Sequence, residues 1–142
     1  MLISLLFLLC LQDTETPPLE PFPETTFLET VRIVHHPPEI MFEGRPYDLE
    51  CFVNFPTDSI QSVHLFLKTN NMSSYQEISL EQNYDMYSYR YFEKNFPAEN
   101  IQYFFLIETS NRLFASPLDS VGHIAPISRK LINPVEYYKS KK

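Results

Sequence analysis

Apolar and polar residues alternate at a period of two through most of the chain beyond residue 30. The pattern is clearest over 47–55, where one set of alternate positions reads Tyr47, Leu49, Cys51, Val53 and Phe55. Successive side chains of a β-strand point to opposite faces, so a strand would place these five residues together. We expect this segment to be a strand with one face in a core.

Similar patterns recur in six further segments, which are 30–36, 62–68, 75–80, 84–92, 102–109 and 113–116. Proline, asparagine and other turn-forming residues separate them, as in Pro56–Ser59 and Phe96–Asn100. About seven short strands with turns between them and no helical pattern predict an all-β antiparallel sandwich. A small closed barrel is the alternative.

Two of these segments carry additional information. Segment 102–109, QYFFLIET, is apolar on both faces, which predicts a central strand. The short connection Ser110–Arg112 predicts a hairpin, with Asn111 the expected residue at positive φ. In 62–68, Val63, Leu65 and Leu67 alternate with a second face made by Ser62, His64, Phe66 and Lys68.

The segments Val63–Lys68 and Tyr103–Pro117 resemble immunoglobulin-like modules of the fibronectin-III-like or early-set kind found in bacterial envelope proteins. Those modules have a strand of the form V-x-L-x-Y-R and a later hairpin that ends in Ser-Pro. The resemblance covers about 30–117 and implies an immunoglobulin-like sandwich. Ser110–Arg112 replaces the usual Asp-Gly turn. A sandwich of this type serves many unrelated functions, so the resemblance does not specify one.

The chain has 142 residues and a formal net charge of −7, which is unevenly distributed. Residues 13–29 contain five acids, four prolines and no base, which predicts an extended tether. Residues 30–142 hold 13 acids and 11 bases, so no basic field favours nucleic-acid binding. We divide the chain into a leader at 1–12, the tether at 13–29, the sandwich at 30–117 and a C-terminal extension at 118–142.

The leader reads MLISLLFLLCLQ, an apolar run of signal-peptide length that is too short to span a bilayer. It predicts export to the periplasm, the outer envelope or the medium. Cys10 stands where the apolar run meets Gln12 and Asp13, as the lipidated cysteine of a bacterial lipoprotein does. Lipidation of Cys10, cleavage without lipidation and an ordinary apolar cysteine remain open; contact with a membrane is expected only through this leader or a lipid.

The extension at 118–142 contains many large apolar side chains, among them Ile124, Ile127, Leu131, Ile132, Val135, Tyr137 and Tyr138. This content is too high for a fully disordered segment. We expect the extension to be partly packed along the sandwich and frayed over its last few residues.

No catalytic motif occurs, and two glycines in the whole chain are too few for a phosphate-binding loop. Cys51 falls on the apolar face of its strand and is expected to be a buried free thiol. His35 and His36 are adjacent, so a strand would point them to opposite faces and they could not easily bind one metal ion. We therefore expect neither enzymatic activity nor a metal or other cofactor.

One group of residues is a candidate binding face: Tyr84, Tyr87, Tyr89 and Tyr91. Tyrosines on a strand surface can anchor a protein or stack on a sugar, although packing inside the sheet is the alternative. The sequence thus favours a non-catalytic interaction or scaffold module of an exported envelope protein, with another envelope protein as partner. A glycan-binding module that uses the tyrosine face is the second hypothesis.

Overall fold

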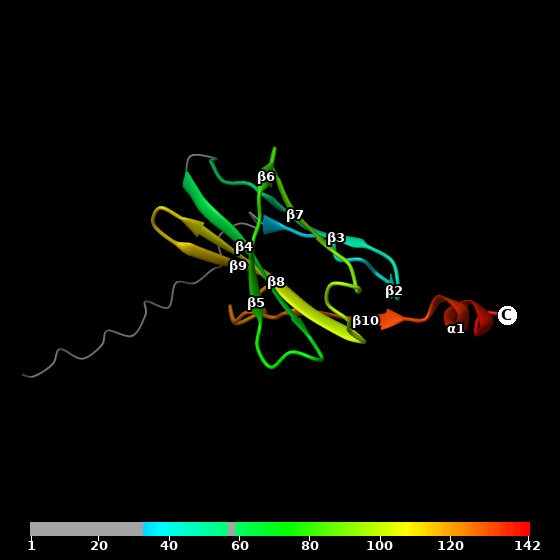
Figure 1. Ribbon diagram of the computed structural model, residues 1–142. Helices are drawn as coiled ribbons and strands as arrows, with labels where there is room; N and C mark the ends of the chain where they lie inside the picture. The colour runs from blue at the N-terminus through cyan, green and yellow to red at the C-terminus, as the bar shows by residue number, and fades with distance from the viewer. Residues whose placement is uncertain (1–32, 57–58) are drawn as a thin grey trace, which may run out of the picture.

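Ten strands and one short helix form the regular structure of residues 33–56 and 59–142, the part of the chain that the computed structural model describes (Figure 1). The first five strands are β1 (Ile33–Val34), β2 (Met41–Phe42), β3 (Tyr47–Val53), β4 (Ile60–Thr69) and β5 (Gln76–Ser79). The others are β6 (Gln82–Asn83), β7 (Met86–Tyr91), β8 (Asn100–Thr109), β9 (Leu113–Ser116) and β10 (Ile127–Ile132), followed by helix α1 (Pro134–Lys139). The predicted leader, Cys10 and the tether lie outside the described residues.

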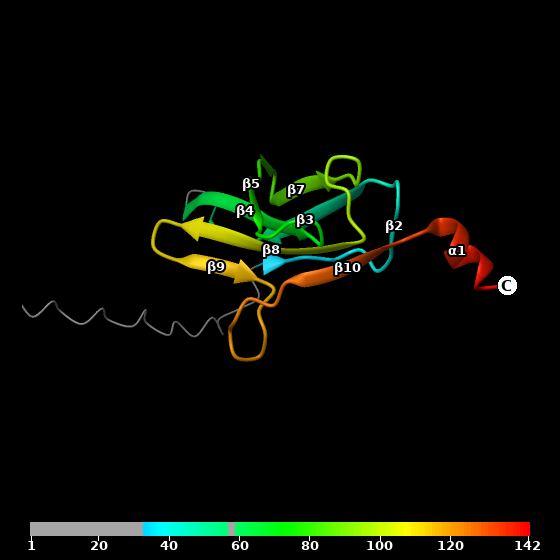
Figure 2. The same cartoon turned by 60° about the horizontal axis from the view of Figure 1, so that its bottom comes forward.

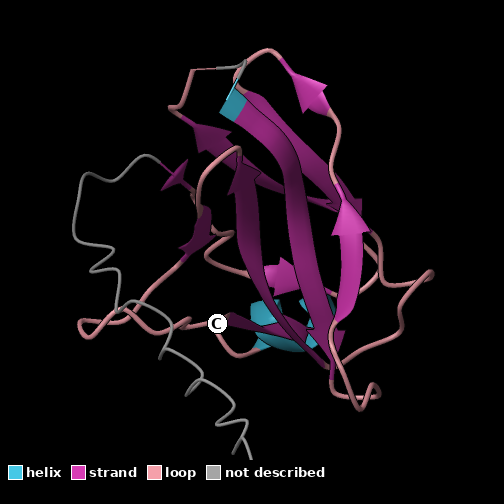
Figure 3. Ribbon diagram, turned by 90° about the vertical axis from the view of Figure 1, so that its left-hand side faces the viewer, coloured by secondary structure: helices cyan, strands magenta, loops and turns pink. Residues whose placement is uncertain are grey.

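The strands form two sheets. The four-stranded sheet has the order β1-β3-β7-β6, and the six-stranded sheet has the order β2-β10-β8-β4-β5, with β9 also paired to β8. Strands β9 and β10 follow one another along the same side of β8, β9 beside Phe105–Glu108 and β10 beside Asn100–Tyr103 (Figure 2). The described chain is therefore a two-sheet β-sandwich in which strands predominate (Figure 3).

The core lies between the inward faces of the two sheets. From the four-stranded sheet it contains Leu49, Cys51 and Val53 of β3, together with Tyr87 and Tyr91 of β7. From the six-stranded sheet it takes alternate residues of β4 and β8, which are Val63, Leu65, Leu67, Ile101, Tyr103, Phe105 and Ile107. The period-two pattern over 47–53 and the central position predicted for 102–109 are thus confirmed.

The prediction of about seven strands is wrong by three. The additional strands are β2, β6 and β10. Strands β2 and β6 have two residues each, too few to show a periodicity. The apolar residues of β10 were assigned to the extension, so the six-stranded sheet continues beyond residue 117.

Two further details differ from the sequence prediction. Strands β2 and β10 pair in parallel, so the sandwich is not entirely antiparallel. Asn111 is not at positive φ; among the described non-glycine residues only Tyr84 is, at 58°. The hairpin at 110–112 is closed instead by Thr109, whose backbone N–H donates to the Arg112 carbonyl at 2.9 Å.

Helix α1 begins at a favourable sequence for a helix start. The Asn133 side chain accepts hydrogen bonds from the backbone N–H groups of Val135 and Glu136, and Pro134 occupies the first turn. The helix lies at one end of the sandwich (Figure 1), where the rings of Tyr137 and Tyr138 contact Phe42 at centroid distances of 5.3 and 5.9 Å. These contacts attach the end of the chain to β2.

Candidate functional site

The four tyrosines expected to form a binding face do not share an exposed surface. Tyr87 and Tyr91 belong to the core, where they are 5% and 0% exposed, and Tyr89 is half-buried against it. The Tyr91 hydroxyl donates to the Phe96 carbonyl at 2.9 Å, and burial raises the pKa of Tyr91 to about 12. The alternation in 84–92 therefore marks the inward face of β7, because the other sheet covers that face.

Tyr84 is separate from the other three tyrosines. It lies in the turn between β6 and β7 and is 91% exposed. Its carbonyl accepts a hydrogen bond from the Gln82 side chain at 2.7 Å. A tyrosine face of these four residues is thus not available for a sugar or a protein.

A different group of aromatic residues lies on the outward face of the six-stranded sheet, and we call it the aromatic strip: Phe66 of β4, Phe104 of β8 and Tyr75 just before β5. The rings of Phe66 and Phe104 stack with centroids 4.9 Å apart and planes 3° apart. Tyr75 meets Phe104 edge-on at 5.2 Å. All three side chains are half-buried.

The strand register brings these rings together. Phe66 is the cross-strand partner of Phe104, and in the next pair along the same face His64 is the partner of Leu106. Directly paired residues of neighbouring strands point to the same side of a sheet and come within contact distance. Because the opposite face of β4 and β8 packs against the four-stranded sheet to form the core, the aromatic strip lies on the outward face of the six-stranded sheet.

Charged and polar groups surround the aromatic strip. At one end the Lys68 Nζ lies 5.8 Å from the centre of the Tyr75 ring. At the other end Glu77 Oε1 lies 3.0 Å from His64 Nδ1, and Glu108 accepts a hydrogen bond from the Ser62 hydroxyl. The face thus has an apolar centre with a basic group on one side and acidic groups on the other.

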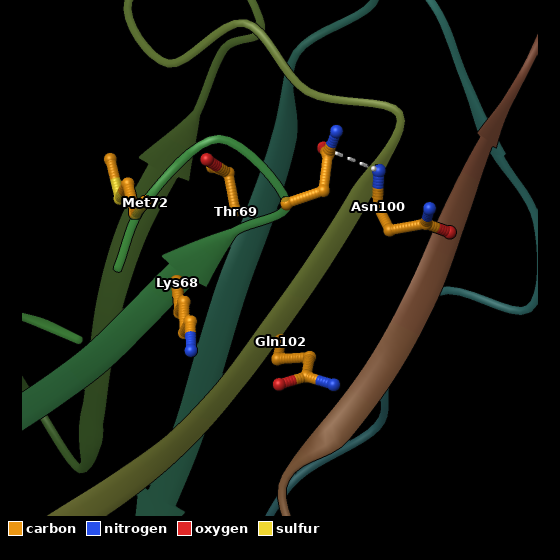
Figure 4. Close-up of a pocket in the computed structure, with 6 residues that line it drawn as sticks. Lys68, Thr69, Met72, Asn100 and Gln102 are labelled. Carbon is orange, nitrogen blue, oxygen red and sulfur yellow. Dashed lines mark hydrogen bonds between the residues drawn. The ribbon is translucent and has the colours of Figure 1, made fainter. Parts of the chain in front are cut away.

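A hollow of about 320 Å³ adjoins the strip on the side of Lys68 (Figure 4). Its lining consists of Lys68, Thr69, Asn70, Met72, Asn100 and Gln102. The Asn70 side-chain oxygen is occupied by the backbone N–H groups of Glu99 and Asn100, whereas Lys68 and Gln102 extend beside each other on the open side. The Tyr75 hydroxyl donates to Gln102 Oε1 at 3.3 Å, which joins the hollow to the strip.

The Cys51 thiol is a core group. Cys51 is fully buried and unpaired within the described residues, as predicted, and burial raises the pKa of its thiol to about 12. A nucleophilic cysteine needs an accessible thiolate. Cys51 therefore fills space in the core and is not placed to attack a substrate.

His35 is half-buried between the two sheets, where it contacts Tyr103, while His36 is exposed. His64 is beside Glu77, and His123 lies 3.5 Å from Asp119 in an exposed loop. Within residues 33–56 and 59–142 no three histidine, cysteine or acidic residues gather as metal ligands would. None of the helices in that part of the chain combines the length and apolar character that crossing a membrane requires.

The aromatic strip was missed in the sequence, although a signal for it was present. Phe66 stood among polar residues on the second face of 62–68, and 102–109 was apolar on both faces. A single aromatic residue on a polar face is common, so this signal was weak by itself. Only the register between β4 and β8 shows that Phe66 and Phe104 face each other.

Comparison with known proteins gives a fold and no family. No protein-family model and no curated protein matches the chain. Among solved structures, the endo-β-1,4-mannanase from Thermotoga petrophila matches with a TM-score of 0.50 and 12% identity, over 74% of this chain and 21% of the mannanase chain. This chain spans about a fifth of that enzyme, and the likeness shows a shared two-sheet β-sandwich.

Proposed function

We propose that this chain is a non-catalytic interaction or scaffold module of an exported cell-envelope protein, and that another envelope protein binds its aromatic strip. The observation that carries the proposal is the strip itself, three contacting, half-buried aromatic residues on the outward face of the six-stranded sheet. Interfaces between proteins commonly have an aromatic centre and a polar rim. Lys68 on one side and Glu77 and Glu108 on the other would pair with opposite charges of the partner.

We assign the sandwich to the immunoglobulin-like type. The topology supports this because β1 joins the β3–β7 sheet whereas β2, a few residues later, joins β10 of the other sheet. Four strands facing a sheet built around β4, β8 and β9 agree with the arrangement of such domains. The sequence resemblance over 63–68 and 103–117 points to the same type.

Two features support a role without catalysis. The Cys51 thiol is buried with a raised pKa, and both ring nitrogens of His35 are occupied by hydrogen bonds within the sandwich. The hollow beside the strip contains one basic side chain, Lys68, and no acidic or histidine side chain with which it could share proton transfer.

Export rests on the apolar run at 1–11 and the acidic, proline-rich segment that follows it. A leader and a spacer would place the sandwich at a distance from the membrane. Lipidation of Cys10 would anchor it there. The intact mass of the chain from membrane and soluble fractions tests this part, since an acylated Cys10 adds the mass of its lipid.

A glycan partner is the second hypothesis, but two of the four tyrosines on which it was based are buried and Tyr84 lies apart from the others. The aromatic strip is less suited to sugars, because the Phe66 and Phe104 rings stack on each other and the Lys68 ammonium group lies over the Tyr75 ring. A sugar ring stacks on an open aromatic face. We therefore favour a protein.

Photo-crosslinking tests the proposal. Benzoylphenylalanine would replace Phe66 or, as the matched control, Phe52, which is 41% exposed on the outward face of the other sheet. We expect a discrete protein adduct in the producing cell from position 66 and none from position 52. The purified partner should then bind the wild-type chain and bind the Phe104→Ala variant at least about tenfold more weakly, a loss typical of an interface anchor.

Equal adducts from both positions, or none from position 66, would contradict the assignment of the strip. A glycan array separates the two hypotheses. Binding to a sugar that Phe104→Ala abolishes would replace the protein partner by a glycan.

A further inference from the structure

His35 lies where the chain crosses from one sheet to the other. Just before it, β1 pairs with β3 in the four-stranded sheet, and shortly after it β2 pairs with β10 in the six-stranded sheet. The crossing contains the sequence His35-His36-Pro37-Pro38. Consecutive prolines supply no N–H donors, so side chains must provide much of the attachment of this segment.

The His35 ring bonds to both sheets. Its Nδ1–H donates to the carbonyl oxygen of Glu50 on β3, and its Nε2 accepts from the Tyr103 hydroxyl on β8 at 2.8 Å. A carbonyl can only accept, so Nδ1 must carry the proton and Nε2 is the acceptor in the neutral ring. The rings of Tyr103 and Phe105 also contact the His35 ring edge-on, with their centroids 5.4 and 5.0 Å from the centroid of His35.

Other interactions of the described segment are limited in number. The Arg129 Nε donates to the Pro38 carbonyl at 2.7 Å, Ile33 packs against the core, and the described part of the β1–β3 ladder has two residue pairs. A two-residue strand contributes little stability by itself. The neutral His35 ring is therefore a principal attachment of residues 33–40.

The surroundings of His35 disfavour a positive charge. Burial lowers its pKa most, with further lowering by His36 on the same segment and by Arg129 on β10. Two other elements pack against the ring. Strand β8 presents the neutral Tyr103 hydroxyl, and β3 presents the Glu50 carbonyl, whose hydrogen bond raises the pKa of His35 and partly offsets the lowering. Among the described groups that act on this ring, none is a carboxylate that could compensate a second proton.

We propose that His35 is an acid-sensitive latch: when its ring takes a second proton, residues 33–40 detach from both sheets while β3, β4, β7 and β8 remain packed. The imidazolium has no lone pair at Nε2 and can only donate there. The buried Tyr103 hydroxyl would therefore have to turn and accept this hydrogen bond, which leaves its own hydrogen without an acceptor. Detachment would free the edge of β3 that β1 now covers, and an uncovered strand edge can pair with another chain.

The direction of the pH effect follows from proton linkage. The detached segment exposes a histidine of ordinary pKa, about 6.5, whereas the attached one has a lower pKa. The detached state therefore binds more protons below about pH 6.5, and acid favours it. The attachment is complete above that pH and weakens as the pH falls toward the lower pKa of the attached state.

Hydrogen exchange of the full chain between pH 8 and pH 5, corrected for the intrinsic exchange rate, tests the latch. We expect the opening constant of residues 33–42 to rise by up to about tenfold per pH unit below about pH 6.5, with no matching rise in β8. His36→Gln is the matched control; it should keep the pH dependence in a somewhat weaker form, because His36 contributes to lowering the pKa of His35. His35→Phe and His35→Gln cannot take the proton, so both should lose the pH dependence.

A flat opening constant for residues 33–42 in wild type would overturn the latch. So would an equal rise in the two His35 variants, or a rise of the same size in β8, which would show global unfolding. An NMR titration of the imidazoles provides a second readout: His35 should titrate below about pH 6.5, the ordinary pKa of histidine, and titration at or above that value would also overturn the proposal.

Discussion

Strand β7 and the strand pair β4–β8 both carry aromatic residues in register, yet the two groups have opposite environments. On β7, Tyr87 and Tyr91 are buried in the core. On β4 and β8, Phe66 and Phe104 stack on the outward face. The comparison shows that a period-two pattern separates the two faces of a strand without saying which one is covered.

Their neighbours explain the difference. Tyr87 is the cross-strand partner of Cys51, which lies on the inward face of β3. Phe66 and Phe104 alternate with Leu65, Leu67, Tyr103 and Phe105, which already fill the inward faces of β4 and β8. Because those apolar neighbours occupy the core, the second aromatic set of β4 and β8 has to face outward.

The largest expected effect is on the labelling rate of Cys51, which lies on the covered, inward face of β3. A pKa raised to about 12 and complete burial leave almost no accessible thiolate. In a Cys10→Ser chain, labelling of Cys51 at pH 8 should be on the order of a thousandfold slower than in denaturant. Labelling of the native chain at a rate near that of the unfolded one would show that this face is open.

Tyr91→Ala tests the burial of the β7 tyrosines through stability. Removing a large, fully buried aromatic side chain leaves a cavity and should lower the free energy of unfolding by about 3–5 kcal/mol, measured by denaturant titration. Tyr91→Phe is the matched control, which keeps the ring and loses the hydrogen bond to Phe96. It should cost about 1 kcal/mol. Equal, small losses in both variants would mean that the ring is not in the core.

Phe66→Ala and Phe104→Ala test the other side of the comparison, and their effect on stability should be smallest. Each removes a half-buried ring and one stacking contact, so each should lower the free energy of unfolding by about 1 kcal/mol. The double variant should cost less than the two single losses combined, because both remove the same stacking contact. A loss as large as that of Tyr91→Ala would show that the strip is a second core and not a surface.

Much of the fold was predictable because strand patterns are local. Alternation over 47–53 and the doubly apolar 102–109 identified β3 and the central β8. Strand β10 was not predictable in the same way, since Ile127 and Leu131 alternate with polar residues over only six residues of an apparent tail. Its assignment depends on pairing with β8, a contact between distant parts of the chain.

The sequence predicted an aromatic binding face, but it placed that face on β7, where Tyr87 and Tyr91 are buried. The contacts that matter join residues far apart, Phe66 to Phe104 across the sheet and His35 to Tyr103 between the sheets. The spacing of the adjacent histidines only disfavours joint metal binding, whereas the two hydrogen bonds of His35 depend on the packed sandwich.

Oxidative footprinting with hydroxyl radicals tests the central claim most directly, by comparing the purified chain with the chain in the cells that produce it. We predict that Phe66, Tyr75 and Phe104 are labelled in the purified chain and become protected several-fold in the cells, as interface anchors do. Tyr84 should be labelled in both states, and the buried Tyr91 in neither. Unchanged labelling of the three strip residues, with protection at Tyr84 instead, would contradict the assignment of the binding surface to the six-stranded sheet.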